Sequence, residues 1–190
     1  SVSAVDIAPL CSAYVFSSWS DGVLTASRDA VASDPLALVA NYTADTVKID
    51  IELNRNYWDM RTYVLDAGNV RTMAGADSIK ISSFSTLPLQ FGLQLLPHSL
   101  FVAAREPNHN AFVLRGVFND GGVPARFSVY KDWVSSNVVW ATSEIYGSGG
   151  FNVAPSTTEK LWLQFVAPSS ISTDGTYTFT LLLWSRVKLP

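Results

Sequence analysis

The chain of 190 residues has few of the side chains that carry catalysis or metal binding. Its single cysteine, Cys11, excludes an internal disulfide and argues against a metal site built on thiolates. The two histidines, His98 and His109, follow none of the spacings that ligate zinc, and no Gly-x-Ser-x-Gly turn presents a nucleophile. We therefore expect no enzymatic activity, no metal site and no cofactor.

Charge of either sign is also sparse. Charged residues make up 15% of the chain, and 13 Lys and Arg against 16 Asp and Glu leave a net charge of -3. Proteins that hold nucleic acid over a broad surface neutralise phosphates with clustered Lys and Arg. Any contact with RNA is therefore expected to be weak or local.

Long apolar runs are absent as well. No stretch approaches the roughly 18 apolar residues that a membrane-spanning helix needs, so we expect no membrane partner. The first residue is Ser1 rather than Met, and we interpret the chain either as the product of proteolytic processing or as a trimmed form of a longer chain.

Apolar and aromatic residues, by contrast, are abundant. Hydrophobic residues make up 48% and aromatic residues 12% of the chain, with six Trp and ten Phe. Such a composition favours strands over a helical bundle, whose exposed faces need more Lys and Glu. We find no linker or repeat, and we expect one domain over residues 1–190 that buries its apolar surplus in a core or against partners.

Alternation of apolar and polar residues predicts two clear strands. Thr46–Leu53 places apolar residues on one face and charged residues on the other, and Tyr177–Leu189 repeats the pattern at greater length. In this last strand Leu182 and Trp184 fall on the otherwise polar face. We expect a neighbouring subunit to cover them, and we assign Trp133 and Trp140 to the same contact.

Shorter strands are expected between these two. Turn sequences rich in Gly, Asn, Asp and Pro separate them at intervals of about ten residues, which is typical of an antiparallel sandwich or barrel. One short helix is expected from Asp34, a capping residue before Pro35, to Tyr42. The shorter strands are expected at Asp59–Leu65, Ser78–Ser83, Leu89–Leu96, Leu100–Arg105, Phe112–Phe118, Arg126–Tyr130, Val138–Thr142 and Leu161–Val166.

The order of these elements resembles that of a known family. The segments Asp34–Tyr42, Thr46–Asn54 and Trp58–Leu65 resemble the helix, strand, Trp and strand of the small coat proteins of picornavirus-like plant viruses, the secovirids such as comoviruses and cheraviruses. The segments Lys160–Val166 and Thr176–Leu189 resemble the last two strands of that subunit. Nodaviruses, tombusviruses and single-stranded DNA viruses have subunits that end in a similar strand.

The resemblance implies an all-β fold, namely an antiparallel eight-stranded jelly-roll sandwich with one or two short helices, spanning residues 1–190. It implies a coat protein cut from a polyprotein that assembles with copies of itself or with sibling coat proteins into an icosahedral virion. The virion would enclose RNA and assemble in the host cytoplasm. On this hypothesis the subunit contacts include Trp184, Leu182, Trp133 and Trp140.

Two alternatives stay open. Tyr57 and Trp58, with Asn54, Asn56 and Asp59 nearby, have the combination of aromatic rings and hydrogen-bonding groups that binds sugars, which predicts a lectin-like β-sandwich. A hydrolase on a sandwich scaffold would require a deep polar pocket that holds a histidine beside a serine or aspartate. Asn41-Tyr42-Thr43 also matches the N-glycosylation sequence.

Overall fold

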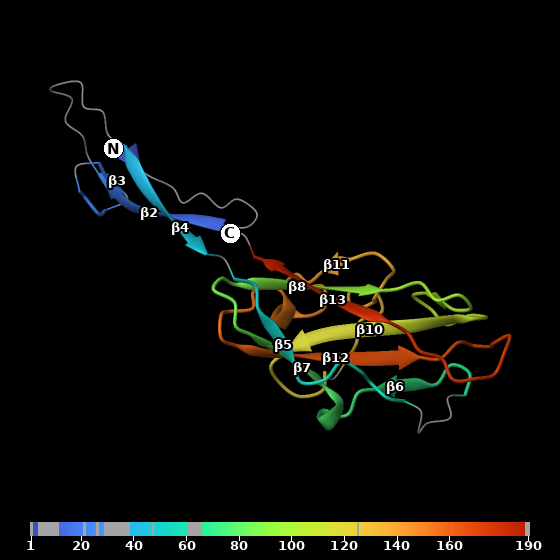
Figure 1. Cartoon of the computed structure of the whole chain (residues 1–190). Helices are drawn as coiled ribbons and strands as arrows, with labels where there is room; N and C mark the ends of the chain where they lie inside the picture. Colours follow the sequence, from blue (N-terminus) through green and yellow to red (C-terminus); the bar gives the residue numbers. More distant parts are fainter. Residues whose placement is uncertain are drawn as a thin grey trace. The chain divides into compact units, whose positions relative to one another are not determined.

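A computed structural model describes residues 2–3, 12–20, 22–25, 27–28, 39–46, 48–60, 66–124 and 126–188 (Figure 1). The chain divides into two compact units, Ser1–Lys48 and Ile49–Pro190. The regular secondary structure of the described residues is β, apart from two short 3-10 turns, η1 (Gly75–Asp77) and η2 (Ser148–Gly150). The all-β class is therefore confirmed. The single domain expected over residues 1–190 stays a prediction, and the two units are described separately.

The described residues of the first unit form two strand pairs. β2 (Ser12–Trp19) pairs with β4 (Ala40–Thr46) in antiparallel fashion, with a register shift between Phe16 and Ser18. The short strands β1 (Val2–Ser3) and β3 (Ser27–Arg28) form the other pair. Trp19 is buried, and its indole Nε1 donates a hydrogen bond to the carbonyl of Thr25 at 3.0 Å.

Two sequence-based expectations fall on this part of the chain. Residues 34–38 of the predicted helix lie outside the described residues, but its end is wrong, because residues 40–42 belong to β4. A hydrogen-bonded partner strand outweighs local helix propensity here. The strand predicted at Thr46–Leu53 is also wrong in its middle, where residues 48–50 are not in a strand. Its last three residues form β5 (Ile51–Leu53).

The second unit is built from two sheets. The larger sheet has the order β5, β7 (Ile79–Ser83), β12 (Thr158–Val166), β10 (Ala111–Asn119) and β9 (Val102–Ala103), and β6 (Val70–Thr72) pairs with the end of β12. The smaller sheet has the order β11 (Val139–Trp140), β8 (Leu89–Leu95) and β13 (Leu181–Val187). All pairings except the parallel β9–β10 contact are antiparallel.

Three of the pairings in the second unit are nested along the chain. β7 pairs with β12, and inside this pair β8 pairs with β11. Inside both, Arg115 of β10 faces Trp133 in an isolated antiparallel bridge. β7, β10 and β12 lie in the larger sheet, whereas β8, β11 and β13 lie in the smaller one. The chain therefore crosses repeatedly between sheets, and each sheet is completed by residues far apart in sequence.

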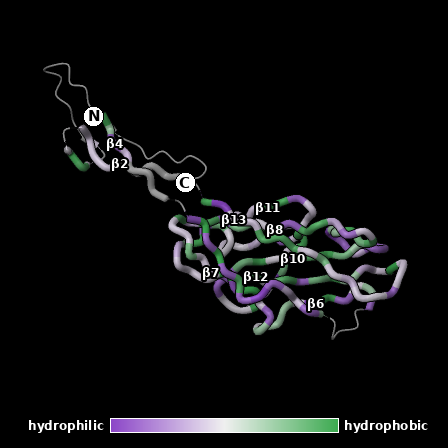
Figure 2. The backbone as a smooth tube through the Cα atoms, viewed as in Figure 1, coloured by the Kyte–Doolittle hydropathy of each residue, from purple (hydrophilic) through white to green (hydrophobic). Residues whose placement is uncertain are grey.

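The core lies between the two sheets. Leu89, Phe91, Leu93 and Leu95 of β8 alternate along the strand and are each at most 3% exposed. The ring of Phe91 lies 5.5 Å from that of Phe118 in β10, which joins the sheets. Figure 2 shows the run of hydrophobic residues along β10. The alternating side chains of β8, β10 and β12 thus form one apolar layer.

Four predicted strands are confirmed to within a few residues. Ser78–Ser83, Leu89–Leu96, Phe112–Phe118 and Leu161–Val166 correspond to β7, β8, β10 and β12. These segments are rich in apolar residues, and β8, β10 and β12 contain runs of consecutive buried residues, which is typical of strands covered on both faces.

Other strand predictions are wrong or too long. Arg126–Tyr130 is not a strand, because the chain turns there and the Asp132 carboxylate accepts a hydrogen bond from the backbone N–H of Ser128. Of Asp59–Leu65, residues 59–60 are not in a strand and 61–65 lie outside the described residues. Strand structure is limited to Val102–Ala103 within Leu100–Arg105, to Val139–Trp140 within Val138–Thr142, and to Leu181–Val187 within Tyr177–Leu189.

Gly150, the last residue of η2, packs closely against Phe118 and Ala141. A Cβ atom at this position would lie 2.5 Å from Cδ2 of the fully buried Phe118 ring and 2.9 Å from Cβ of Ala141. We expect Gly150→Ala to lower the free energy of unfolding by about 1–3 kcal/mol, because the core must shift to admit the methyl group. Urea denaturation measures this change. Gly122→Ala, which meets nothing within 4 Å, is the matched control, and equal effects of the two substitutions would contradict the packing.

Candidate interaction surface on the smaller sheet

Two tryptophans flank a glycine across the smaller sheet. In the strand registers Gly92 of β8 lies opposite Trp140 of β11 on one side and Trp184 of β13 on the other. Directly opposed residues of antiparallel strands share a face. Because the neighbours Phe91 and Leu93 are fully buried in the core, this row lies on the face directed away from the core.

The glycine allows one indole to lie across the strand. A Cβ atom at Gly92 would be 2.9 Å from Cε3 of Trp140 and 3.2 Å from the carbonyl oxygen of Val139. Any larger residue would therefore displace the Trp140 ring. The sequence PLQFGLQLL contains this glycine within an apolar run, where a glycine is typical of a close approach by another group.

Glutamine side chains hold the residues on either side of the row. Trp184 Nε1 donates to Oε1 of Gln94 at 3.0 Å, and Gln94 Nε2 donates to the carbonyl of Ser136 at 2.9 Å. Arg186 Nε donates to Oε1 of Gln90 at 2.9 Å. Both glutamines thus hold side chains of β13 in fixed orientations.

The remaining contacts complete a flat surface of aromatic and polar groups. The guanidinium carbon of Arg186 lies 4.2 Å from the centroid of the Trp140 ring, a cation–π contact. Trp184 is 42% exposed, and Leu182, opposite Gln94, is half-buried. We call this surface the tryptophan face. It consists of Gln90, Gly92, Gln94, Trp140, Leu182, Trp184 and Arg186.

The structure thus brings together three of the four residues predicted to contact a neighbouring subunit. Leu182 and Trp184 lie on β13, and Trp140 lies across the same face. Trp133 lies apart from them, because it is opposite Arg115 at the edge of the larger sheet. The four residues therefore lie on two separate surfaces, one on the smaller sheet and one beside β10 of the larger sheet. The role of each residue in assembly stays a prediction. The glycine and glutamine members of the face were missed, since neither residue type stands out in a sequence.

Asp132 is the residue before Trp133, and it lies on the core side of the segment that faces Arg115. Gly116 donates its N–H to the carbonyl of Asp132 at 2.8 Å, and Gly116 faces Leu93 of the opposite sheet. The Asp132 side chain is consequently buried, and burial raises the pKa of its carboxyl above the usual range. The hydrogen bond from Ser128 and the charges of Arg115 and Lys131 lower this pKa in part.

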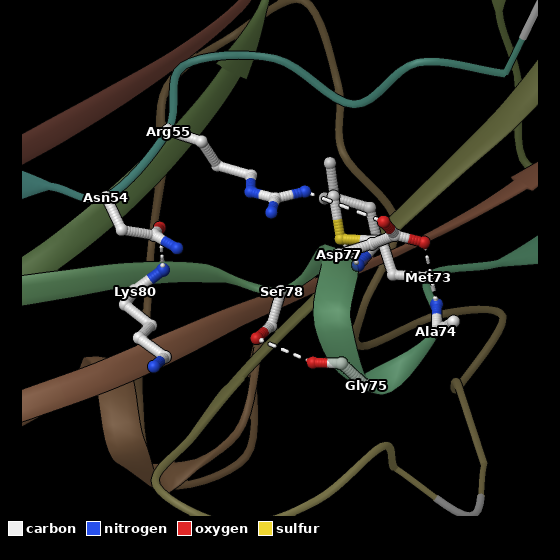
Figure 3. A network of polar contacts seen from close by, with 9 residues as sticks. Asn54, Arg55, Met73, Ala74, Gly75, Asp77, Ser78 and Lys80 are labelled. Atoms are coloured by element: carbon white, nitrogen blue, oxygen red, sulfur yellow. Dashed lines mark hydrogen bonds and ion pairs between the residues drawn. The ribbon is translucent and has the colours of Figure 1, made fainter.

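The residues predicted to bind a sugar are divided between structural and exposed positions. The Asn54 Oδ1 accepts a hydrogen bond from the backbone N–H of Lys80 at 2.6 Å, which fixes it beside β7 (Figure 3). Tyr57 is 66% exposed, Asn56 and Asp59 are exposed, and Trp58 is half-buried against the core.

Trp58 also lines a small hollow of about 130 Å³. Arg71, Thr72 and Asp77 contribute polar groups to its wall. Asp77 is held in place by an ion pair with Arg55 at 3.5 Å and by the backbone N–H of Ala74 at 3.4 Å (Figure 3). The hollow therefore combines one aromatic ring with oriented polar groups.

The two histidines lie in different surroundings. His98 packs among aromatic rings, with centroids 5.1 Å from Phe179 and 5.4 Å from Phe101. His109 approaches Ser170 Oγ at 2.9 Å and Ser172 Oγ at 3.1 Å, but its side chain is exposed rather than in the deep pocket that the hydrolase hypothesis requires.

The described ranges contain no group of three or more His, Cys, Asp or Glu side chains placed to hold a metal ion. The same ranges include no helix long and apolar enough to cross a membrane.

Comparisons with protein-family models, with curated proteins and with solved structures find no match to this chain.

Asp132 gives a pH-dependent prediction. Because burial raises its pKa in the folded state, this carboxyl contributes less stability as the pH rises through that pKa. Asp132→Asn removes the ionisation while retaining an oxygen that accepts the Ser128 N–H. We expect the variant to melt at a higher temperature than the parent at about pH 7 and at a similar temperature at about pH 4.

Thermal unfolding followed by circular dichroism at both pH values measures this difference. The exposed Asp174 provides the control, and Asp174→Asn is expected to leave the pH dependence unchanged. A destabilised Asp132→Asn protein at neutral pH would contradict the assignment.

Proposed function

We propose that this protein is a virus coat-protein subunit with a jelly-roll fold that assembles with copies of itself or sibling coat proteins into an icosahedral shell enclosing RNA. The observation that carries the proposal is the nested strand pairing of the second unit, in which the chain crosses repeatedly between two sheets.

Nested pairing of this kind is what a jelly roll requires. In that fold a long antiparallel ribbon rolls up, so that strands paired along the ribbon form two facing sheets with further contacts between its turns. Here the ribbon pairs are β7–β12, β8–β11 and the Arg115–Trp133 bridge. The pairings β8–β13 and β10–β12 are the contacts between successive turns of the rolled ribbon. The eight-stranded form of the proposal adds one further strand along the outer edge of β13.

The tryptophan face supports a role in subunit contact. Trp and Arg are the residues most enriched where protein interfaces gain their binding energy, and this face presents Trp184, Trp140 and Arg186 together. The side-chain amides of Gln90 and Gln94 already have partners within the subunit, with Gln90 Nε2 donating to the carbonyl of Ala141 at 2.5 Å. Covering the face with another subunit would therefore bury apolar area without leaving these amides unsatisfied.

The sequence resemblance supports the particular kind of assembly. The secovirid-like order of segments is the basis for proposing a polyprotein product, an RNA-containing virion and assembly in the host cytoplasm. The small net charge of -3 agrees with a shell whose contact with RNA is local.

Trp184 tests the proposed subunit contact. We expect Trp184→Asp to remain folded, because its side chain is 42% exposed, and to lose assembly, because a charge would be buried at each contact. The loss should be at least about 2 kcal/mol per contact. Light scattering and negative-stain electron microscopy measure particle yield.

Tyr57→Asp is the matched control, since Tyr57 is 66% exposed and lies outside the tryptophan face. It is expected to assemble normally. Particles formed by Trp184→Asp at the parental yield would show that the tryptophan face is not a subunit contact. A parent protein that stays monomeric under all assembly conditions would refute the coat-protein proposal itself.

The hollow beside Trp58 supports a second candidate function, carbohydrate binding. An aromatic ring stacks on the apolar face of a sugar, and the groups of Arg71, Thr72 and Asp77 are placed to meet its hydroxyls. Tyr57 and Asp59 would extend the site beside the hollow, while Asn54 supports it through Lys80.

Titration with a panel of mono- and oligosaccharides, followed by isothermal calorimetry, tests this candidate. We expect Trp58→Ala to weaken sugar binding at least about tenfold and Trp184→Ala to leave it unchanged. Absence of binding by the parent protein, or binding that survives Trp58→Ala, would refute carbohydrate recognition at this hollow.

A further inference from the structure

A cluster of cations and aromatic rings lies at the edge of the larger sheet, apart from the tryptophan face. The guanidinium carbon of Arg105 lies 5.2 Å from the centroid of the Trp133 ring and 5.8 Å from that of Tyr130. Trp133 shares a face with Arg115, which it opposes in the bridge to β10. One arginine thus lies beside two rings, and a second arginine is anchored in the sheet.

The cluster is held rigidly on its inner side. Val134 donates its N–H to the carbonyl of Leu114 at 2.8 Å, and Gly116 donates to Asp132 at 2.8 Å, so the segment with Trp133 is hydrogen-bonded to β10 on both sides. Arg115 donates from Nη1 to Oε1 of Gln164 at 2.6 Å. The sheet therefore fixes the bases of these side chains.

The outer side of the cluster is open. Tyr130 is 74% exposed and Arg105 is exposed. A tyrosine this far out of the core gains little from burial, and its free face can stack on a planar group. The guanidinium of Arg105 lies over this ring, 5.8 Å from its centroid, so positive charge and an exposed aromatic ring occur together.

Hydrogen-bond donors exceed acceptors within the cluster. Arg115 Nε and Trp133 Nε1 are buried and have no acceptor among the residues that the structure describes. Lys131 is paired with Glu144 at 3.0 Å, and the Asp132 carboxylate is buried on the opposite side of the strand. Two donors on the inner side of the cluster are therefore unpaired, and the exposed positive charge of the cluster is that of Arg105.

We propose that the cluster of Arg105, Tyr130, Trp133 and Arg115 is a local binding site for single-stranded RNA, in which a base stacks on Tyr130 and the adjoining phosphate contacts Arg105. Aromatic platforms combined with arginine are the arrangement by which proteins bind single strands without reading sequence. An acidic peptide would use the guanidinium but leave the exposed tyrosine face unused. The inference deepens the proposed coat-protein function, because it names where the enclosed RNA would be contacted.

Fluorescence anisotropy with a labelled single-stranded RNA of mixed sequence, at low salt, tests the site on the full chain. We expect Tyr130→Ala to weaken binding about tenfold, since a stacked base is lost. Arg105→Gln should weaken binding and reduce the slope of log affinity against log salt by about 0.7, the value for one phosphate contact on a single strand. Fully double-stranded RNA, whose bases are unavailable, should bind less tightly than the single strand.

Two controls distinguish RNA binding at this site from non-specific RNA binding and from loss of folding. Tyr57→Ala removes another exposed tyrosine and should leave RNA affinity unchanged. The unfolding midpoint of each variant is measured. If Tyr130→Ala proves unstable, Arg105→Gln still tests the RNA site, because it changes only an exposed side chain. No binding by the parent protein, or equal affinity in the parent and both site variants, would overturn the inference.

Particle assays distinguish failure of the RNA-site proposal from failure of the coat-protein proposal. If particles of Tyr130→Ala form at normal yield but contain less RNA, judged by the ratio of absorbance at about 260 and 280 nm, both proposals are supported. Particles with the parental RNA content would overturn the RNA site while leaving the coat-protein role intact. Tyrosine-dependent RNA binding by a parent that forms no particles would overturn only the coat-protein role.

Discussion

The packing of β8 against β10 is the contact on which the second unit depends. Four apolar side chains of β8 lie at most 3% exposed, and Phe91 meets Phe118 across the interlayer space. Gly116 makes the approach possible, because a Cβ atom there would lie 2.7 Å from Cδ1 of Leu93. Since neither sheet is completed by neighbouring strands in sequence, the sheets are stable only when this apolar layer forms between them.

The same layer determines which residues are left for function. Strand side chains alternate, so burying Phe91 and Leu93 directs Gly92 and its tryptophan neighbours outward. On the larger sheet, burying Leu114 directs Arg115 to the far side, opposite Trp133. Both proposed interaction sites therefore include outward-facing side chains of strands whose inward-facing side chains form the core. The subunit-contact proposal and the RNA proposal draw on different sheets and stand independently in the geometry.

Prediction from the sequence succeeded where one physical signal dominated. Ile79–Ser83, Leu89–Leu95, Ala111–Asn119 and Thr158–Val166 are strands rich in apolar residues that contribute to the core, and each was expected within a few residues. Short strands such as β9 and β11 were overextended, because alternation continues beyond the residues that find a hydrogen-bonding partner. Of the candidate sites, the outward Trp184 and Leu182 were visible as exceptions in a polar face. Arg105 and Tyr130 were not grouped, since their proximity depends on pairings between distant segments.

The sequence by itself determined the all-β class, the position of the main strands and the lack of standard catalytic or metal motifs, because these follow from local periodicity and composition. Only the tertiary structure decided that Trp140 and Trp184 share a row across Gly92 while Trp133 lies on the other sheet. The reason is physical: residues on one strand are related by chain geometry, whereas residues on different strands are related by register. In this fold, register is set by long-range burial of the core rather than by neighbours in the sequence.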